Sequence, residues 1–84
     1  MGSSIQVTIL YFAQVREATK VNRETLEITE NTSVTDLLSL IRMRYPKLRT
    51  AGDFKTCVNQ KLVMTNAILK DKDEVALLPP ISGG

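Results

Sequence analysis

The sequence has no histidine and a single cysteine, Cys57, among its 84 residues. It therefore offers no imidazole base, and without clustered carboxylates at ligand spacing it lacks the common ligand sets of metal sites. A single cysteine also excludes an intramolecular disulfide and fits a reducing compartment. Because no imidazole is present to activate its thiol, Cys57 is interpreted as a packing residue. We expect neither a metal nor a bound cofactor in this chain.

Glycine and net charge are scarce as well. The four glycines stand at positions 2, 52, 83 and 84, which excludes a glycine-rich phosphate loop. Eleven basic and nine acidic residues give a net charge of only +2, too little for a nucleic-acid footprint. No apolar run approaches the roughly 18 residues that span a membrane, and the N-terminus lacks the layout of a signal peptide. These absences predict a cytosolic protein that binds neither nucleic acid nor a membrane.

What is present has the composition of an ordinary globular domain, with 43% hydrophobic and 24% charged residues. A chain of this size buries only about 60–65% of the surface that its unfolded form exposes, which leaves room for one modest core. We expect one domain over residues 1–78, followed by a flexible tail over residues 79–84.

Alternating apolar residues predict two strands, at 5–12 and 24–28, that form a hairpin. Residues 13–22 are charged and polar without a sustained period, so we expect a connecting loop there. Further short apolar segments predict a strand at 56–58, its return at 61–64 and a last strand at 74–78.

One helix is predicted between residues 34 and 45. Ser33 is a suitable N-cap, and Asp36 stands where a capping box places an acidic residue. Pro46 ends the helix, and residues 46–55 are expected to form a loop. Apolar side chains recur at helical spacing and form one stripe: Val34, Leu37, Leu38, Ile41 and Tyr45.

This order of elements predicts an α+β fold, a mixed sheet with one main helix packed on one face. The first and last strands are the most apolar and should lie side by side in its centre. If Val75 and Leu77 face the helix, alternation turns Leu78, Phe12 and Leu62 to the opposite face. Nothing obvious covers that face, so we predict that these three residues dock a protein partner. The alternative is that long loops fold over them.

The last six residues begin with two prolines, which restrict the backbone, and end with two glycines, which carry no side chains. Pro79 and Pro80 end the last strand because proline has no N–H for the ladder and fixes φ. At about 3.3 Å per residue, the tail carries the Gly84 carboxylate roughly 20 Å from the domain. Gly83 and Gly84 have no Cβ and therefore fit a narrow channel beside a nucleotide. Once adenylated by a partner enzyme, the carboxylate becomes an acyl donor to sulfur or to an amine; the alternative is an ordinary disordered chain end.

Three segments resemble the small subunit of molybdopterin synthase, in the sulfur-carrier family with the ubiquitin-like β-grasp fold: residues 10–17 (LYFAQVRE), 58–60 (VNQ) and 73–84 (DEVALLPPISGG). The similarity extends from residue 5 to residue 84. It implies that an E1-like enzyme uses ATP to adenylate Gly84, which is then converted to a thiocarboxylate.

The resemblance also implies the partner and the reaction. The large synthase subunit supplies the active site, two copies of each subunit form a heterotetramer, and the sulfur goes to cyclic pyranopterin monophosphate. As an isolated chain the protein would have no active site of its own. The subunit interface of the family implies a partner-binding role for Phe12, Leu62 and Leu78, and the tail that enters the large subunit corresponds to Pro79, Pro80, Ile81, Ser82, Gly83 and Gly84.

The chain departs from the family at two turns, where Lys20 and Lys72 stand in place of glycine. A non-glycine residue at positive φ costs about 1–2 kcal/mol, so these turns could be reshaped. Three other functions stay open: a ubiquitin-like modifier conjugated through Gly84, a sulfur carrier for thiazole synthesis, and a pure interaction domain for which Gly83 and Gly84 are dispensable.

Overall fold

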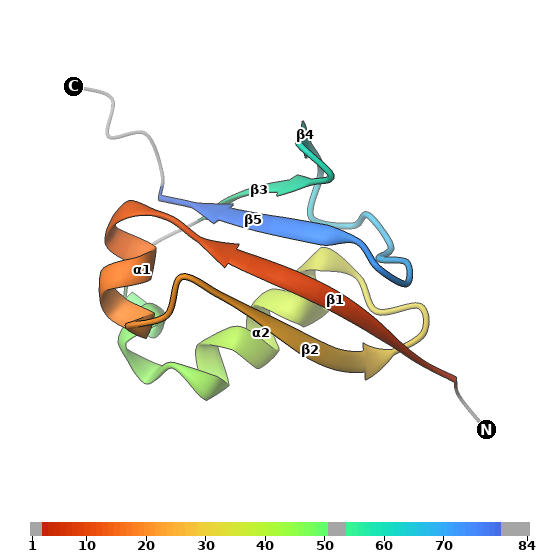
Figure 1. The fold of residues 1–84 in the computed structure, drawn as a ribbon, viewed down its shortest axis with the longest axis horizontal. Coiled ribbons are helices and arrows are strands. Elements are labelled where there is room, and N and C mark those ends of the chain that lie inside the picture. Colours follow the sequence, from red (N-terminus) through yellow and green to blue (C-terminus); the bar gives the residue numbers. More distant parts are fainter. Residues whose placement is uncertain (1–2, 51–53, 80–84) are drawn as a thin grey trace.

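The computed structural model describes residues 3–50 and 54–79 of the chain, the side chain of Thr50 excepted. Within them a five-stranded sheet packs against helices on one face (Figure 1). The elements, in chain order, are β1 (Ser4–Tyr11), α1 (Ala13–Thr19), β2 (Arg23–Thr29), α2 (Val34–Arg44), the 3₁₀ helix η1 (Pro46–Thr50), β3 (Lys55–Val58), β4 (Lys61–Leu62) and β5 (Glu74–Leu78).

The sheet is mixed and its strand order is β2-β1-β5-β3-β4. The hairpin partners β1 and β2 are antiparallel, as predicted. β5 lies in the middle, parallel to β1 and antiparallel to β3. The prediction that the last strand lies beside the first in the centre of the sheet is confirmed, and so is the fold class.

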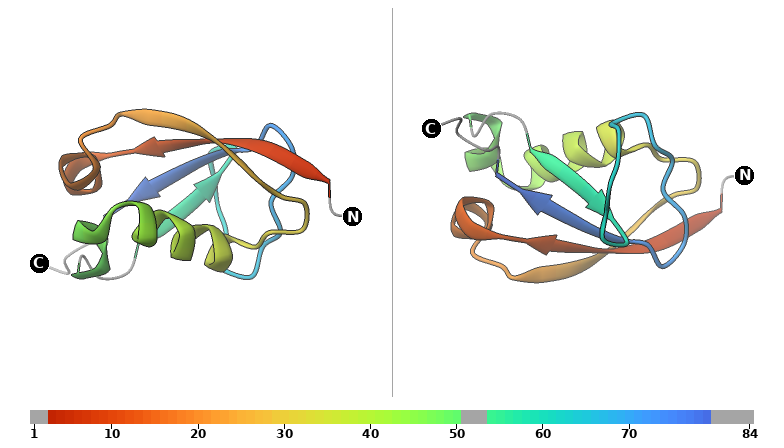
Figure 2. Two further views of the ribbon diagram at one scale, coloured as in Figure 1. Left: turned by 90° about the horizontal axis from the view of Figure 1, so that it is seen from below. Right: turned by 90° about the horizontal axis from the view of Figure 1, so that it is seen from above.

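The core lies between the sheet and α2. In the view from below in Figure 2, α2 runs along one side of the strands. Ile9 of β1 and the inward residues of β5, Val75 and Leu77, are completely buried there. Leu37 and Ile41 from α2 meet them and are equally inaccessible. Alternation in the strands and the helical stripe therefore converge on one apolar layer, as their periods predict.

The start and end of α2 follow the signals in the sequence. The side-chain oxygen of Ser33 accepts a hydrogen bond from the backbone N–H of Asp36 at 3.1 Å, which satisfies one of the free donors of the first turn. The helix ends at Arg44, directly before Tyr45 and Pro46.

Two segments expected to be loops are helical instead. Residues 13–22 contain α1, whose Val15 and Thr19 are buried at helical spacing against the core. Seven residues allow only two such contacts, too few to stand out as a period, and no side chain caps the helix at Phe12. Residues 46–50, expected in a loop, form η1, in which the fully buried Leu48 donates its N–H to the carbonyl of Tyr45.

The predicted return strand at 61–64 is shorter than expected, because β4 comprises only Lys61 and Leu62. The N–H of Val63 still reaches the carbonyl of Thr56 at 3.1 Å. Beyond this bond the chain leaves the sheet, with Met64 exposed. No helix among the described residues is long and apolar enough to cross a membrane.

The two lysines in place of glycine occupy the left-handed conformation after all. Lys20 has φ 64° and Lys72 has φ 70°. Lys20 is the C-cap of α1 and its N–H bonds to the carbonyl of Arg16 at 2.8 Å. The N–H of Lys72 bonds to the carbonyl of Gln6 at 2.7 Å. Both turns thus have the positive φ that glycine adopts most easily, and each lysine carries the steric cost of a side chain in that conformation.

Candidate functional site

The last described strand, β5, is the central strand of the sheet, and its C-terminal end is the base of the predicted tail. Leu78, the last residue of β5, pairs with Lys55 of β3, and Leu77 pairs with both Tyr11 of β1 and Thr56 of β3. A strand held by ladders on both sides gives the chain a fixed point and direction of departure. Pro79 follows it and is half-buried.

Most of the predicted tail lies outside the described residues. Pro80, Ile81, Ser82, Gly83 and Gly84 belong to this part. The roles assigned to them stay predictions, as does the boundary between domain and tail at residue 78.

The face of the sheet opposite α2 carries a row of apolar side chains at the end where β5 finishes. The register aligns Leu10 of β1 with Ala76 of β5, Ala76 with Cys57 of β3, and Cys57 with Leu62 of β4. Side chains directly opposite one another across neighbouring strands share a face and touch. The row therefore runs across four strands on the side away from the core.

Phe12 and Leu78 extend this row toward the tail. Phe12 is extended, with φ −121° and ψ 150°, so its side chain points away from the buried Tyr11 that precedes it. Tyr11 pairs with Leu77, which brings Phe12 level with Leu78. We call the six residues of this surface the outer patch: Leu10, Phe12, Cys57, Leu62, Ala76 and Leu78.

The outer patch is accessible. Phe12 is 40% exposed and Leu62 is 67% exposed, and the other four members are half-buried. The structure thus places Phe12, Leu62 and Leu78 together on one uncovered face. No loop within residues 3–50 and 54–79 buries them, and their binding role stays a prediction.

Cys57, interpreted from the sequence as a packing residue, is a half-buried free thiol on the outer face, a placement that the sequence reasoning did not give. Its place two residues after Lys55, in alternation with the buried Thr56, was the available signal.

The remainder of the outer face is polar. Toward the start of β1, Gln6 pairs with Glu27 and Thr8 pairs with Thr25, while Glu74 lies on the other side of Thr8. The apolar surface is therefore confined to the end of the sheet from which the tail departs. An apolar patch with a polar surround is the usual composition of a protein-binding surface.

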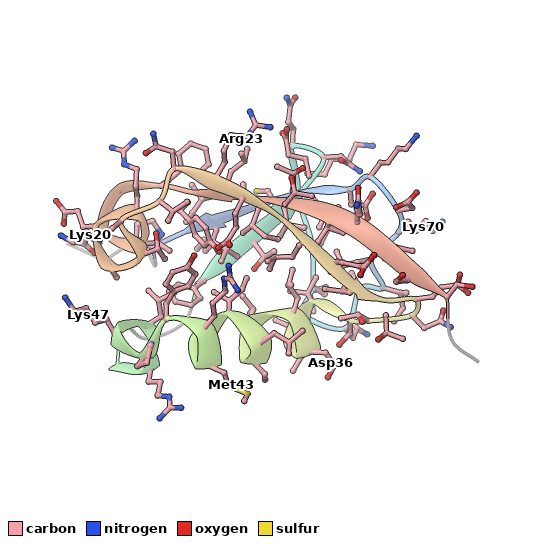
Figure 3. The ribbon with its side chains drawn as sticks, turned by 60° about the horizontal axis from the view of Figure 1, so that its bottom comes forward. Lys20, Arg23, Asp36, Met43, Lys47 and Lys70 are labelled. Atoms are coloured by element: carbon pink, nitrogen blue, oxygen red, sulfur yellow. The ribbon has the colours of Figure 1, made fainter. Side chains whose placement is uncertain are left out.

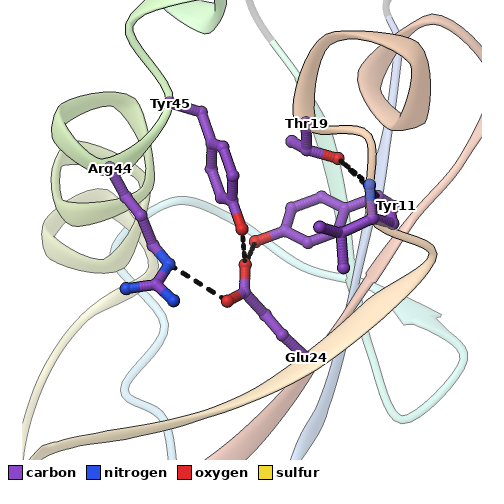
Figure 4. Close-up of polar contacts among 6 residues, drawn as sticks. Tyr11, Thr19, Glu24, Arg44 and Tyr45 are labelled. Carbon is purple, nitrogen blue, oxygen red and sulfur yellow. Dashed lines mark hydrogen bonds and ion pairs between the residues drawn. The ribbon is translucent and has the colours of Figure 1, made fainter.

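A polar cluster on the inner side fixes the strand end that carries Phe12 (Figure 4). One oxygen of Glu24 accepts hydrogen bonds from the hydroxyls of Tyr11 at 2.5 Å and Tyr45 at 2.6 Å. Its other oxygen accepts from Arg44 Nε at 3.0 Å. Glu24 thereby ties the C-terminal end of α2 to β1 and β2.

The two tyrosines of this cluster hold their protons strongly. Burial raises the pKa of the Tyr11 phenol well above its usual range, and the neighbouring Glu24 carboxylate raises it further. Burial and Glu24 also raise the pKa of Tyr45, although Arg44 acts in the opposite direction. The cluster is a rigid support, and the rings of Tyr11 and Tyr45 meet edge to face at 5.8 Å.

An open pocket of about 280 Å³ adjoins the outer patch at Leu62. Phe54, Thr56, Val63 and Met64 line it, so its walls are mostly apolar. Among the described residues no group of three or more histidine, cysteine, aspartate or glutamate side chains is arranged to hold a metal ion.

Comparison with known protein families gives a match over residues 9–84 to the ThiS family. The chain belongs to this family. Nearly the whole sequence takes part in the match, the three resembling segments included.

Curated relatives of the family match over their full length. The chain is 42% identical to the molybdopterin synthase sulfur carrier subunit of Chlamydomonas reinhardtii, over 95% of this chain and 100% of that protein. It is 38% identical to the protein of the same name from Mycobacterium tuberculosis, over 95% and 99% of the two chains.

Solved structures confirm the β-grasp fold. A putative molybdopterin converting factor subunit 1 from Pyrococcus furiosus matches with a TM-score of 0.85 and 30% identity, over 92% of this chain and 99% of that one. One chain of a complex of subunits 1 and 2 of the molybdopterin-converting factor from Helicobacter pylori matches with a TM-score of 0.63 and 26% identity, over 95% and 100%. Small archaeal modifier protein 1 from Methanosarcina acetivorans matches with a TM-score of 0.79 and 28% identity, over 99% and 100%.

Proposed function

We propose that this protein is the sulfur carrier subunit of molybdopterin synthase and that its Gly84 carboxylate carries the sulfur as a thiocarboxylate. The observation that carries the proposal is the placement of the strand end. β5 pairs with β1 on one side and β3 on the other, and it finishes at Leu78, which pairs with Lys55 and belongs to the outer patch. The relatives named as such carriers, 42% and 38% identical over nearly the whole chain, support it.

The chemistry follows from the weakness of a carboxylate as an acyl donor. An E1-like enzyme joins the Gly84 carboxylate oxygen to the α-phosphate of ATP and releases pyrophosphate. Hydrosulfide released by the sulfur source then attacks the acyl carbon, displaces AMP and loses its proton, which leaves the thiocarboxylate. ATP is thus a substrate of the activating enzyme rather than a group held by this chain, which contributes the acyl group and its delivery.

Delivery requires docking and reach together. The outer patch binds the large subunit, as a heterotetramer with two copies of each chain, and the six residues after Leu78 span roughly 20 Å at about 3.3 Å each. That length carries the sulfur into a recessed site of the partner, where cyclic pyranopterin monophosphate receives it. Because β5 pairs with both β1 and β3, the tail leaves the domain in a fixed direction. Its last two residues are glycines and carry no side chains.

The experiment uses the full-length chain, with intact-mass analysis verifying that Gly84 is its last residue. Incubation with the activating enzyme, ATP and a sulfur source should raise the mass by the difference between one sulfur and one oxygen atom. Wild type should restore molybdoenzyme activity to a strain lacking the small subunit, and the deletion of Gly83 and Gly84 should abolish restoration. Met43→Ala, at an exposed residue of α2 outside the tail and the outer patch, is the control and should restore activity.

A second candidate is a protein modifier that forms isopeptide bonds through Gly84, favoured by the 28% identical archaeal modifier protein. Conjugation would give ladders of higher mass on lysines of other proteins, whereas sulfur transfer gives one product of defined mass. A carrier for thiazole synthesis would form the thiocarboxylate but would not restore molybdoenzyme activity. If the chain without Gly83 and Gly84 worked as well as wild type, the protein would be an interaction domain only.

A further inference from the structure

The small net charge conceals a separation of charge along the long axis of the molecule. β1 and β5 run in parallel toward the end from which the tail departs, where α1, η1 and the start of β3 also lie (Figure 1). Exposed basic side chains gather at this end, which we call the basic end: Arg16, Lys20, Arg23, Lys47, Arg49 and Lys55. The described carboxylates there are Glu17 and Glu24, and Glu24 is already bound to Arg44.

The opposite end has the reverse composition. It contains the turn after β2, the first turn of α2, the turn before β5 and the turn between β3 and β4, whose Asn59 bonds to Glu74. Its basic residues are Lys61, Lys70 and Lys72. Figure 3 shows Lys20 and Lys47 at one end and Lys70 at the other. The acidic residues of this second end are Glu27, Glu30, Asp36, Asp71, Asp73 and Glu74.

The two ends act as separate patches of charge in solution. β1 has eight residues and at about 3.3 Å per residue spans roughly 26 Å. Counterions screen exposed charges over about 8 Å at physiological ionic strength. A partner that approaches the outer patch therefore meets mainly the field of the basic end. Of the acidic residues, Glu74 lies nearest, on the outer face two residues before Ala76.

Two of the basic residues flank the outer patch itself. Arg23 of β2 pairs with Leu10, and Lys55 of β3 pairs with Leu78, so both share the outer face with the patch. Figure 3 shows Arg23 on the side of the sheet away from α2. β1 and β5 lie between their strands, which separates the two backbones by about 14 Å at roughly 4.8 Å per strand.

We propose that the partner surface that receives the outer patch is apolar at its centre and carries carboxylates on both sides, facing Arg23 and Lys55. This inference rests on the proposed function and identifies the partner as the large synthase subunit. The basic end steers the collision so that the base of the tail, rather than the acidic end, arrives first. Charges at a rim act mainly on the association rate constant, and their effect falls as salt rises.

The test measures association and dissociation rate constants with the large subunit from the same organism. Arg23→Glu with Lys55→Glu reverses the flanking charges, and Lys70→Glu with Lys72→Glu makes the same change in net charge at the acidic end. At low salt the first pair should lower the association rate constant about 10-fold and the second less than about twofold. In about 0.5 M salt the two pairs should agree. Circular dichroism verifies that each variant is folded.

Three results would overturn the inference. Equal slowing by both pairs would mean that net charge alone matters, and no slowing by either would mean that apolar contact alone guides association. Faster dissociation with an unchanged association rate constant would also contradict steering. Failure of the proposed function has a different signature, because wild type would then form no complex with the large subunit at any salt concentration, and the inference would fall with it.

Discussion

The two faces of the sheet carry similar apolar side chains at the end where β5 finishes, yet only one is covered. Val75 and Leu77 point to α2 and are completely buried, whereas Ala76 and Leu78, their immediate neighbours in sequence, stay half-buried on the other side. Both faces would be called hydrophobic core from composition. The difference is that helices cover the inner face, and the outer one is available to another protein.

The largest effect should come from the inner face. Leu77→Ala leaves a cavity beneath α2 and should lower the free energy of unfolding by about 3 kcal/mol. Leu78→Ala removes the same atoms from a half-buried site and should cost about 1 kcal/mol or less. Urea unfolding of the two variants measures the contrast, and equal losses would mean that the outer face belongs to the core.

Affinity for the large subunit should depend on the outer face and not on the inner one. Phe12→Asp or Leu62→Asp places a charge in the outer patch and should weaken the complex with the large subunit about 100-fold, because desolvated anchors dominate interface energies. Titration calorimetry measures the affinity. Met43→Asp is the control, since Met43 is 69% exposed on α2 and lies on the opposite side of the molecule from Arg23, which flanks the patch (Figure 3). Unchanged binding by both patch variants would remove the outer face from the interface.

A smaller effect concerns the polar cluster at the rim of the inner face. The pKa of Tyr11 is raised on folding, so below the ordinary tyrosine pKa both states hold the proton and stability is unaffected. Above about pH 10 the unfolded state releases the proton first, and the free energy of unfolding should fall by about 1.4 kcal/mol per pH unit. Urea unfolding between pH 9 and 11 measures this slope, which Tyr11→Phe should reduce. An identical slope in that variant would exclude Tyr11 as its source.

The smallest change lies at the two turns outside both faces. Lys20→Gly and Lys72→Gly relieve a side chain at positive φ and should each raise the free energy of unfolding by about 1 kcal/mol. Lys70→Gly, in the same turn as Lys72 but without positive φ, should lower it by a few tenths to about 1 kcal/mol. Thermal or urea unfolding of the three variants measures these changes in the free energy of unfolding. A loss of stability in all three would mean that the turns gain nothing from glycine.

Long periodic segments were predictable, and short helices were not. α2 has a cap at Ser33, a stripe of apolar residues and a stop at Pro46, so three independent signals agree. α1 has only Val15 and Thr19 as buried residues, too few to establish a period. η1 depends on the burial of Leu48, which the sequence alone does not specify. Tertiary contacts stabilise such short helices, because their nucleation is unfavourable in isolation.

The surface around the predicted docking residues was predictable only in part. Alternation identified Phe12, Leu62 and Leu78, because side-chain parity in a strand is a local property. Cys57 was missed, since its contact with Ala76 depends on how β3 aligns with β5. Arg23 was missed for the same reason: its strand had to pair with β1 before its side chain could flank Leu10.

The sequence by itself determined which residues alternate, where α2 begins and ends, and that two prolines, Ile81, Ser82 and two glycines follow the last strand. Those are properties of neighbours along the chain, governed by steric limits and hydrogen bonding within a few residues. Only the tertiary structure decided which apolar face is buried and which end of the molecule is basic. Both depend on strand order and register, which bring together residues such as Leu10, Lys55 and Leu78 that local rules cannot relate to one another.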